Sequence, residues 1–277
     1  MPLVPTIKLH NGVEIPQVGF GVFQVPEDET RAAVTNALEA GYRSIDTAAA
    51  YGNEHGVGEA LKASGIARDD LFVTTKLWNS AQGYDSTLRA FDDSMGKLGL
   101  EQLDLYLIHW PVPAADKFVD TWKAFEKLHA DGRVRAIGVS NFQPKHLRRL
   151  LDEGLTLPTV NQVELHPALQ QATLRAFHTE HGIVTEAWSP LAQGEVLDAP
   201  EITKAAAKHG KSPAQVVLRW HLQLGNVVIP KSVTPKRIAE NIALFDFDLD
   251  GDDLAAIAGL ERGHRTGPDP DKFNAGA

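Results

Sequence analysis

Residues 43–54, R-S-I-D-T-A-A-A-Y-G-N-E, are typical of a buried strand that runs through a loop into a helix. Asp46 follows a short alternation of polar and apolar residues, and Tyr51 lies a few positions further on, in the expected loop. The same order of strand, loop and helix then recurs along the chain. This first unit therefore predicts the fold and supplies two candidate reactive groups.

Eight strand-like runs alternate with helix-like segments, and no linker rich in proline or serine interrupts them. The strands are expected at 17–20, 43–46, 71–75, 103–108, 134–139, 159–163, 183–187 and 226–229. The helices are expected near 28–41, 54–64, 84–98, 117–131, 143–152, 170–181, 212–223 and 235–243. This alternation predicts an α/β fold, a (β/α)8 TIM barrel that forms a single domain over residues 1–277.

Further segments lie outside the repeat. An Asn-Gly pair between two short alternating runs predicts an N-terminal β-hairpin within residues 6–16. Residues 189–211, together with a patch at 251–260, predict two extra helical segments. The tail from residue 262 is rich in glycine and proline and should be irregular. Its composition leaves open whether it covers one end of the barrel or extends into solvent.

The residues that flank the expected helices support their limits. Asp28 and Asp85 are predicted N-caps, and Ser212 before Pro213 combines a cap with a proline in the first helical position. Glycines that close helical patterns predict left-handed C-terminal residues; they are Gly41, Gly99, Gly132, Gly182 and Gly225.

Composition narrows the class of protein. The net charge of −9 argues against nucleic acid as the main partner, although a local basic cluster could still bind an anionic ligand. The absence of cysteine excludes disulfides and thiolate catalysis. The N-terminus lacks the pattern of a signal peptide, and no run approaches the ~20 apolar residues that span a membrane. We expect a soluble, cytoplasmic monomer without contact to membranes.

Four residues suited to proton transfer follow different expected strands. Asp46, Lys76 and His109 recur about every 30 residues, which is one strand–helix unit, and Tyr51 follows Asp46 closely. Because the carboxyl ends of barrel strands meet at one rim, we expect these side chains to converge. A lone Asp–Lys pair or a lone buried histidine has an ordinary structural explanation. Four such groups at one rim favour a catalytic site.

The neighbours of Lys76 suggest how such a site would work. Lys76 lies in an apolar setting, so its ammonium group should be desolvated and should pair with Asp46. An ammonium group near Tyr51 would lower the pKa of the phenol from its reference value of about 10. Tyr51 would then act as a general acid, and His109 could orient a substrate carbonyl group.

Six motifs contain or surround these residues. They are I-D-T-A-A-A-Y-G-N-E at 45–54, T-K-L-W at 75–78, D-L-Y-L-I-H-W-P at 104–111, G-V-S-N-F at 138–142, N-Q-V-E-L-H-P at 161–167 and I-P-K-S-V at 229–233. Together they resemble the aldo-keto reductase family, most closely its small bacterial members such as the 2,5-diketo-D-gluconate reductases. The resemblance extends from the hairpin to about residue 247.

The resemblance implies a catalytic tetrad of Asp46, Tyr51, Lys76 and His109, with Tyr51 as the proton donor. The reaction would be NADPH-dependent reduction of an aldehyde or ketone, including dicarbonyls and keto-sugars, to an alcohol. The hairpin would close the end of the barrel opposite the active site. The expected substrate contacts are Phe23, Tyr51, Trp78, His109 and Trp110, with residues from the 112–121 loop and the tail, around a fairly open pocket.

The family also implies that NADPH binds without a Rossmann fold, and no G-x-G-x-x-G motif follows an expected strand. The residues implied for the nicotinamide are Ser140, Asn141, Gln162 and Trp188, the last by ring stacking. Those implied for the loop over the pyrophosphate are Pro190, Leu191, Gln193 and Gly194. Those implied for the adenosine 2′-phosphate and adenine are Lys231, Ser232, Val233, Arg237, Glu240 and Asn241. A solvated helix start is the structural alternative for the two cations of this last group.

Two other functions remain open. A different enzyme class, such as an isomerase or lyase, could use the same barrel. Alternatively, the protein could be a regulatory module that binds NADPH with little turnover. Two residues depart from the family pattern: His55 stands where an acidic residue is common, and Ala192 replaces a frequent glycine.

A pair of histidines has the spacing of a helical metal chelate. His178 and His181 occur in H-T-E-H, three residues apart. The segment has the pattern of an exposed helix and carries none of the zinc signatures. We therefore expect both rings on the surface and no metal site.

Overall fold

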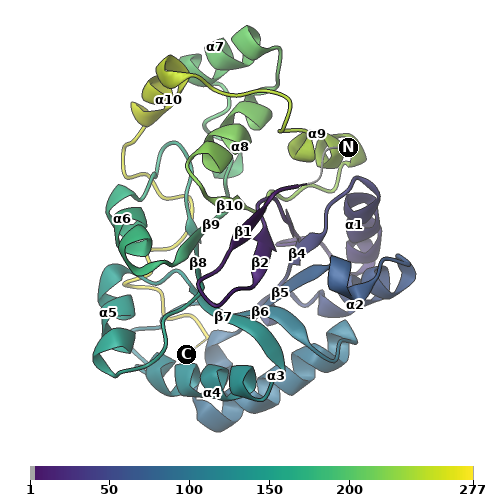
Figure 1. Ribbon diagram of the computed structural model, residues 1–277, viewed down its shortest axis with the longest axis vertical. Coiled ribbons are helices and arrows are strands. Elements are labelled where there is room, and N and C mark those ends of the chain that lie inside the picture. The colour runs from purple at the N-terminus through teal and green to yellow at the C-terminus, as the bar shows by residue number, and fades with distance from the viewer. Residues whose placement is uncertain (1–3, 277) are drawn as a thin grey trace.

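Eight parallel strands form the centre of the structure, a computed structural model that describes residues 4–276. They are β3 (Phe20–Gly21), β4 (Ser44–Asp46), β5 (Phe72–Leu77), β6 (Leu103–Ile108), β7 (Val134–Ser140), β8 (Val160–Glu164), β9 (Val184–Trp188) and β10 (Val227–Val228). Their order in the sheet is their order in the chain, and a parallel bridge between Val18 and Val228 joins the first edge to the last (Figure 1). The predicted (β/α)8 barrel is confirmed.

Helices follow the strands and surround the barrel (Figure 1). Those of the repeat are α1 (Glu27–Glu39), α2 (Glu54–Ala63), α3 (Tyr84–Leu98), α4 (Phe118–Ala130), α5 (Pro144–Asp152), α6 (Ala172–His181), α8 (Pro213–Gln223) and α9 (Pro235–Ile242). The extra helices are α7 (Pro200–His209) and α10 (Gly251–Ala258), which lie side by side at one edge of the molecule. Lys208 Nζ lies 3.1 Å from Asp253 Oδ2, which ties the two extra helices together.

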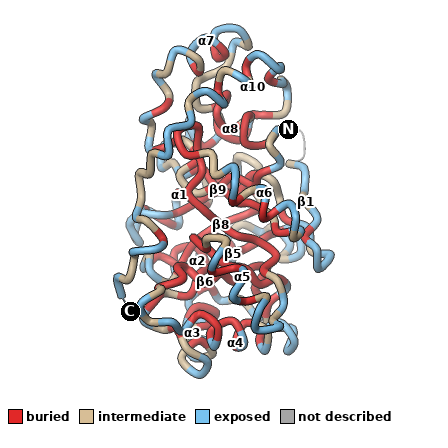
Figure 2. Tube along the Cα trace, turned by 90° about the vertical axis from the view of Figure 1, so that its left-hand side faces the viewer, coloured by how far each residue is buried: buried red, intermediate tan, exposed pale blue. Residues whose placement is uncertain are grey.

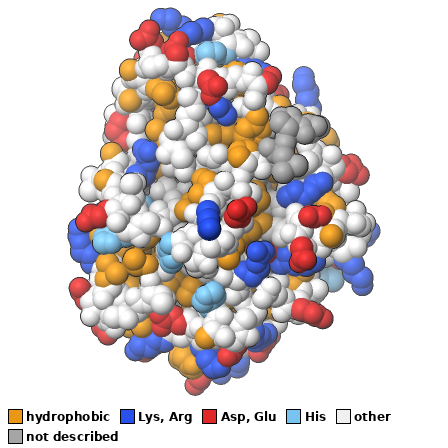
Figure 3. All heavy atoms as spheres, viewed as in Figure 1, with side chains coloured by type: hydrophobic (Ala, Val, Ile, Leu, Met, Phe, Trp, Pro, Cys, Tyr) orange, Lys and Arg blue, Asp and Glu red, His pale blue; other side chains and the backbone are white. Residues whose placement is uncertain are grey.

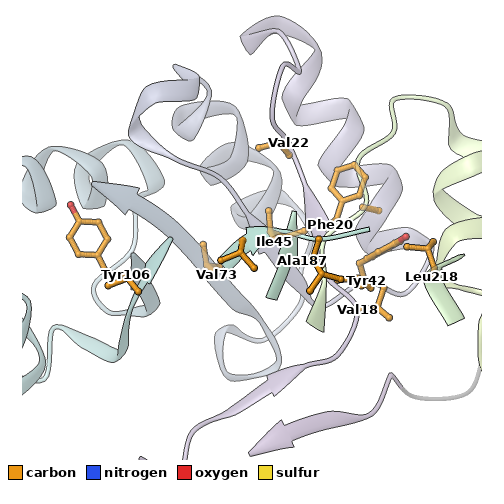
Figure 4. Packing of buried hydrophobic residues seen from close by; sticks show 14 of the residues in the cluster. Val18, Phe20, Val22, Tyr42, Ile45, Val73, Tyr106, Ala187 and Leu218 are labelled. Carbon is orange, nitrogen blue, oxygen red and sulfur yellow. The ribbon is translucent and has the colours of Figure 1, made fainter. Parts of the chain in front are cut away.

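The alternation along each strand separates an apolar outer layer from residues that point into the barrel. Ile45 and Val73 belong to the cluster that packs between strands and helices, where Figure 4 shows them. Tyr106 of the same cluster stacks on Phe125 of α4 with ring centroids 4.4 Å apart. Because neighbouring residues on a strand point to opposite faces, residues such as Asp46 point inward. Inside the barrel, apolar residues such as Leu105 and Leu107 form a second core, and the inward-pointing polar residues are available for chemistry.

The N-terminal hairpin closes one end of the barrel, as predicted. Its strands are β1 (Thr6–Lys8) and β2 (Glu14–Pro16), paired antiparallel. Leu9 and Ile15 of the hairpin are buried against residues that begin barrel strands, including Phe72. Figure 2 shows β1 and the C-terminus on opposite sides of the red, buried barrel. On the hairpin face, basic and acidic side chains are interspersed (Figure 3), as on an ordinary solvated surface.

The C-terminal tail covers the other end, which decides the question that composition left open. Asn79 Nδ2 donates to the carbonyl oxygen of Ala275 at 2.8 Å. The ring of Phe273 lies 4.3 Å, between centroids, from that of Trp110. The tail therefore lies over the carboxyl ends of the strands, where the candidate residues are.

Helix capping differs from the prediction at two places. The N-caps of α1 and α3 are Pro26 and Gly83, so Asp28 and Asp85 lie inside the first turn and the predicted caps were wrong. A carboxylate in the first turn still stabilises the helix through its interaction with the helix dipole. Ser212 is confirmed as the N-cap of α8, and its hydroxyl accepts from the Gln215 amide. All five glycines predicted at helix ends have positive φ.

Candidate active site

The tetrad predicted from strand spacing comes together inside the carboxyl end of the barrel. Asp46 ends β4, Lys76 lies near the end of β5, and His109 directly follows β6. Tyr51 ends a short 3-10 helix, η1 (Ala49–Tyr51), which turns it back toward the barrel. Its ring lies 5.7 Å from that of His109, between centroids.

The buried ammonium group of Lys76 is the centre of this arrangement. Lys76 Nζ lies 2.5 Å from Asp46 Oδ1, 2.9 Å from the carbonyl oxygen of Thr47 and 3.5 Å from the hydroxyl of Tyr51. An ammonium group has three donors, and here it has three acceptors. Burial of a charge is tolerated when it is paired and its donors are used. The cation is thus held rigidly within reach of the phenol.

Burial and charge shift the pKa of both partners. Burial alone would lower the pKa of Lys76, but Asp46 opposes it, and the result is a pKa above the ordinary value. Burial raises the pKa of Tyr51, and the nearby Lys76 ammonium offsets only part of that effect. The prediction of a lowered Tyr51 pKa was therefore wrong, because desolvation of the phenolate outweighs the attraction of the cation.

His109 is a buried, neutral imidazole. Burial, and then the nearby Lys76, lower its pKa well below the usual value. Within residues 4–276, its Nδ1 atom has no hydrogen-bond partner. The ring packs edge-on against Trp78, with centroids 5.3 Å apart. A neutral ring fixed in this way can offer an N–H group to a substrate oxygen.

Aromatic rings pack against Tyr51 and His109 of the tetrad. Phe23 lies 5.1 Å from Tyr51, between ring centroids, and 54% of Phe23 is exposed. Trp78 and Trp110 flank His109. The tail, which was expected to contribute to the substrate pocket, adds Phe273 beside Trp110. The five expected contacts therefore form one connected cluster of rings, and the tail packs against it.

Three residues predicted for the nicotinamide form a hydrogen-bonded chain beside His109. Trp188 Nε1 donates to Asn141 Oδ1 at 2.8 Å. Asn141 Nδ2 donates to the carbonyl oxygen of His109 at 3.0 Å and to Ser140 Oγ at 3.1 Å. The Asn141 backbone has φ of 65°, a left-handed conformation that asparagine tolerates better than most residues. These side chains thus form a rigid polar wall next to the tetrad.

Gln162, the fourth of these residues, pairs with Ser140 in the strand register and contacts two carboxyl groups. Its Nε2 atom is 2.8 Å from Asp46 Oδ2 and 2.8 Å from Glu186 Oε2. Sequence reasoning missed Glu186. The available signal was its position in V-T-E-A-W, where strand alternation places it on the same face as Trp188.

The loop after β9 has unusual backbone geometry. It holds the residues implied for the pyrophosphate: Pro190, Leu191, Gln193 and Gly194. Ala192, which replaces a frequent glycine, has φ of 49°, and the next residue, Gln193, has φ of 55°. Such φ values strain residues other than glycine. His221 Nε2 lies 3.2 Å from the carbonyl oxygen of Pro190 and anchors the start of the loop.

The residues implied for the adenosine end lie on α9 and in the segment directly before it. Lys231, Ser232 and Val233 precede the helix; Arg237, Glu240 and Asn241 lie on it. Lys231 and Arg237 are exposed, and neither forms an ion pair with another residue of 4–276. Two unpaired cations at a helix N-terminus suit a phosphate group.

Two sequence interpretations concern histidines outside this site. His178 is only 1% exposed, and its ring nitrogens contact Asn161 Nδ2 at 2.9 Å and Thr185 Oγ1 at 2.8 Å. The expectation of a surface ring was wrong for His178, because β8 and β9 supply polar partners behind α6. Throughout the described residues, no group of three or more metal-binding side chains is present. His55 is exposed and lies 3.7 Å from Glu59.

Comparison with known proteins identifies this architecture. The sequence model of the Aldo/keto reductase family matches residues 17–262. The chain belongs to the aldo/keto reductase family. It is 60% identical over 270 residues to an aldo-keto reductase of Mycolicibacterium smegmatis, covering 98% of both chains. It is 56% identical over 272 residues to the methylglyoxal reductase DkgA of Salmonella typhimurium, covering 97% of this chain and 98% of the relative.

Other relatives support the same family assignment. A glyoxal reductase of Bacillus subtilis is 54% identical over 272 residues, covering 98% of both chains. Among solved structures, a Gox0644 mutant in complex with NADPH has a TM-score of 0.94 and 52% identity, covering 97% of this chain and 98% of that chain. The resemblance to aldo-keto reductases read from the motifs is confirmed. The chain is an oxidoreductase of this family.

Proposed function

We propose that the protein reduces small aldehydes and ketones, including dicarbonyls and keto-sugars, to alcohols with NADPH as cofactor, and that Tyr51 is the general acid. The observation that carries the proposal is the buried Lys76–Asp46 pair, whose ammonium group lies 3.5 Å from the Tyr51 hydroxyl. In aldo-keto reductases, such a phenol delivers a proton to the reacting oxygen.

The residues present fit NADPH. Solved relatives include complexes with NADPH and with NADP. In this chain, Ser140, Asn141 and Gln162 would hold the carboxamide, and Trp188 would stack on the ring. The strained loop after β9 would fold over the pyrophosphate, through Pro190, Leu191, Gln193 and Gly194. The adenosine end would be held by Lys231, Ser232, Val233, Arg237, Glu240 and Asn241.

When bound, NADPH supplies the hydride that reaches the carbonyl carbon. The protein supplies the proton and the electrostatic environment. The substrate oxygen would lie between Tyr51 and the neutral ring of His109, which stabilise the charge that develops there. The raised pKa of Tyr51 keeps its proton in place until that charge appears. Lys76 then stabilises the phenolate that remains.

The aromatic cluster beside the tetrad and the named relatives both support the substrate class. Phe23, Trp78 and Trp110 provide an aromatic wall with Tyr51 and His109 as its polar groups, which suits a small carbonyl compound. The relatives named methylglyoxal reductase and glyoxal reductase support dicarbonyl substrates. They also weigh against a regulatory module with little turnover, and no finding favours an isomerase or a lyase.

The remaining expectations complete the proposal. Residues 1–277 would form one barrel domain that acts as a monomer in the cytoplasm, on small molecules and not on nucleic acid. Between residues 4 and 276, no helix is long and apolar enough to cross a membrane. Size-exclusion chromatography coupled to light scattering would test the oligomeric state.

The test of the function is a titration followed by an assay. NADPH binding is measured by fluorescence, and NADPH consumption is then followed with methylglyoxal, glyoxal and simple aldehydes. We expect consumption that depends on the carbonyl substrate and is unchanged by EDTA. NADPH binding without consumption of any carbonyl would instead support the regulatory module. Absence of binding would overturn both.

A further inference from the structure

The interior of the barrel contains a second carboxyl group that the proposed mechanism does not use. Glu186 on β9 is 1% exposed and lies directly beside Gln162 in the β8–β9 register. Gln162 Nε2 is 2.8 Å from Glu186 Oε2 and 2.8 Å from Asp46 Oδ2. A single amide nitrogen is thus shared between a tetrad residue and Glu186.

The chemistry of the amide group fixes which way the Gln162 nitrogen and oxygen point. A primary amide carries two N–H donors on nitrogen and only acceptor sites on oxygen. The two N–H groups of Gln162 are used by the two carboxyl groups. A flipped amide would place its oxygen against Asp46, which already accepts from Lys76. Within the described residues, the Gln162 side-chain oxygen itself accepts no hydrogen bond.

We propose that Glu186 is a positioning residue that accepts the second N–H of Gln162 and so holds the Gln162 side-chain oxygen toward the NH₂ group of the nicotinamide carboxamide. This inference rests on the proposed function, because it assumes that NADPH binds beside Gln162. Glu186 acts through Gln162 and contacts neither substrate nor the reacting atoms.

The cost of burying Glu186 supports a role beyond packing. Burial, and next the Asp46 carboxylate, raise the pKa of Glu186 to about 8. A buried carboxyl group that resists ionisation destabilises a fold compared with an apolar side chain of similar size. In either protonation state the group keeps an acceptor oxygen for Gln162. The charged groups that face it are Asp46 and Lys76, so a protonated Glu186 adds no second negative charge beside the tetrad.

The test separates the nicotinamide half of the cofactor from the adenosine half. Dissociation constants are measured for NADPH and for 2′,5′-ADP, which lacks the nicotinamide. Glu186→Leu removes the acceptor. It should weaken NADPH binding roughly five- to tenfold, which corresponds to the loss of one hydrogen bond, and should leave the affinity for 2′,5′-ADP unchanged. Glu186→Gln keeps an acceptor oxygen and should bind NADPH within about twofold of the wild type. Glu186→Met replaces the leucine variant if that one fails to fold.

A double-mutant cycle tests whether Glu186 acts through Gln162. In a Gln162→Leu background, Glu186→Leu should cause no further loss of NADPH affinity. The inference would be overturned if Glu186→Leu caused the same loss of NADPH affinity in the Gln162→Leu background as in the wild type. It would also be overturned if both apolar variants, Glu186→Leu and Glu186→Met, bound NADPH as the wild type does. Equal losses of affinity for NADPH and for 2′,5′-ADP would overturn it as well. Wild-type protein that fails to bind NADPH would instead overturn the proposed function, so the two failures are distinguishable.

Discussion

Lys76 Nζ lies 3.5 Å from the hydroxyl oxygen of Tyr51, the longest of the three contacts that this buried ammonium group makes. The two closer contacts hold the cation in place, and the longer one leaves the phenol with its own proton. Burial keeps the pKa of Tyr51 above its ordinary value despite this neighbour. The site is therefore ready to donate a proton, and Lys76 stabilises the anion that donation produces.

Tyr51→Phe should abolish most of the carbonyl reduction. The substitution removes only the hydroxyl, so turnover should fall by about 10²–10⁴-fold, the usual contribution of a general acid. NADPH affinity, measured by fluorescence, should stay within about twofold, because the ring remains. Tyr84→Phe is the matched control, since Tyr84 lies on the surface at the start of α3. Unchanged turnover in Tyr51→Phe would exclude the proposed mechanism.

Asp46→Asn should destabilise the protein and should also lower the rate of carbonyl reduction. The substitution keeps the shape of the side chain but leaves the buried Lys76 without its counter-charge, which costs roughly 3–5 kcal/mol in such sites. The pKa of Lys76 should then fall, because burial is no longer opposed by Asp46. Urea unfolding measures the change in the free energy of unfolding. Asp92→Asn, which breaks the exposed pair with Arg133, should cost less than about 1 kcal/mol; similar losses in both variants would contradict the prediction.

Much of the fold and of the tetrad could be predicted because both depend on local periodicity. The spacing of one strand–helix unit between Asp46, Lys76 and His109 implies one rim, and the structure places them there. The pKa of Tyr51 depends instead on how deeply the ring is buried. That depth is set by η1 and by packing from distant parts of the chain, which no short motif reveals.

Pairings between distant segments were not predictable for the same reason. Gln162 and Glu186 meet only through the register of β8 and β9. His178 is buried because Asn161 and Thr185 lie behind its helix, although its local pattern resembles a surface. The tail is irregular, so no periodicity indicates where it lies. Its position follows from single contacts, such as that of Phe273 with Trp110.

Arg237→Ala should weaken the binding of NADPH much more than the binding of NADH. Arg237 is exposed at the start of α9 and has no ion-pair partner in the range 4–276, so an added 2′-phosphate group is its natural counter-ion. A charge-assisted hydrogen bond of this kind is worth about 1.5–3 kcal/mol, or roughly 10- to 150-fold in affinity. Fluorescence titrations with both cofactors measure the ratio. Lys204→Ala on α7 serves as the control, and equal weakening of NADPH and NADH would remove the 2′-phosphate assignment.

Gly267→Ala should disturb the ring that is expected to stack on the nicotinamide. A Cβ atom at position 267 would clash with Trp188 Cη2, so either the ring or the tail must move. We expect a changed tryptophan fluorescence spectrum and weaker NADPH binding. Gly96→Ala on α3 is the control, because a Cβ atom there meets nothing within 4 Å, and it should stabilise the helix by up to about 1 kcal/mol. An unchanged spectrum with unchanged affinity would show that Gly267 does not constrain Trp188.

Glu186 should give the stability of the protein a distinctive dependence on pH. Its pKa rises from 4.5 to about 8 in the folded state, chiefly through burial. The folded protein thus holds this proton more tightly than the unfolded chain. The associated stabilisation is complete below the unfolded pKa of 4.5 and is lost as pH rises through about 8.

Glu186→Gln removes this titration and keeps the size of the side chain. The variant should therefore gain stability relative to the wild type as the pH is raised, with a difference on the order of a few kcal/mol above pH ~8. Urea unfolding of both proteins between about pH 5 and pH 9 measures it. Asp46 and Lys76 remain in both proteins, so their own titrations largely cancel in the comparison. Parallel stability curves over this range would show that Glu186 ionises as readily in the folded protein as in the unfolded chain.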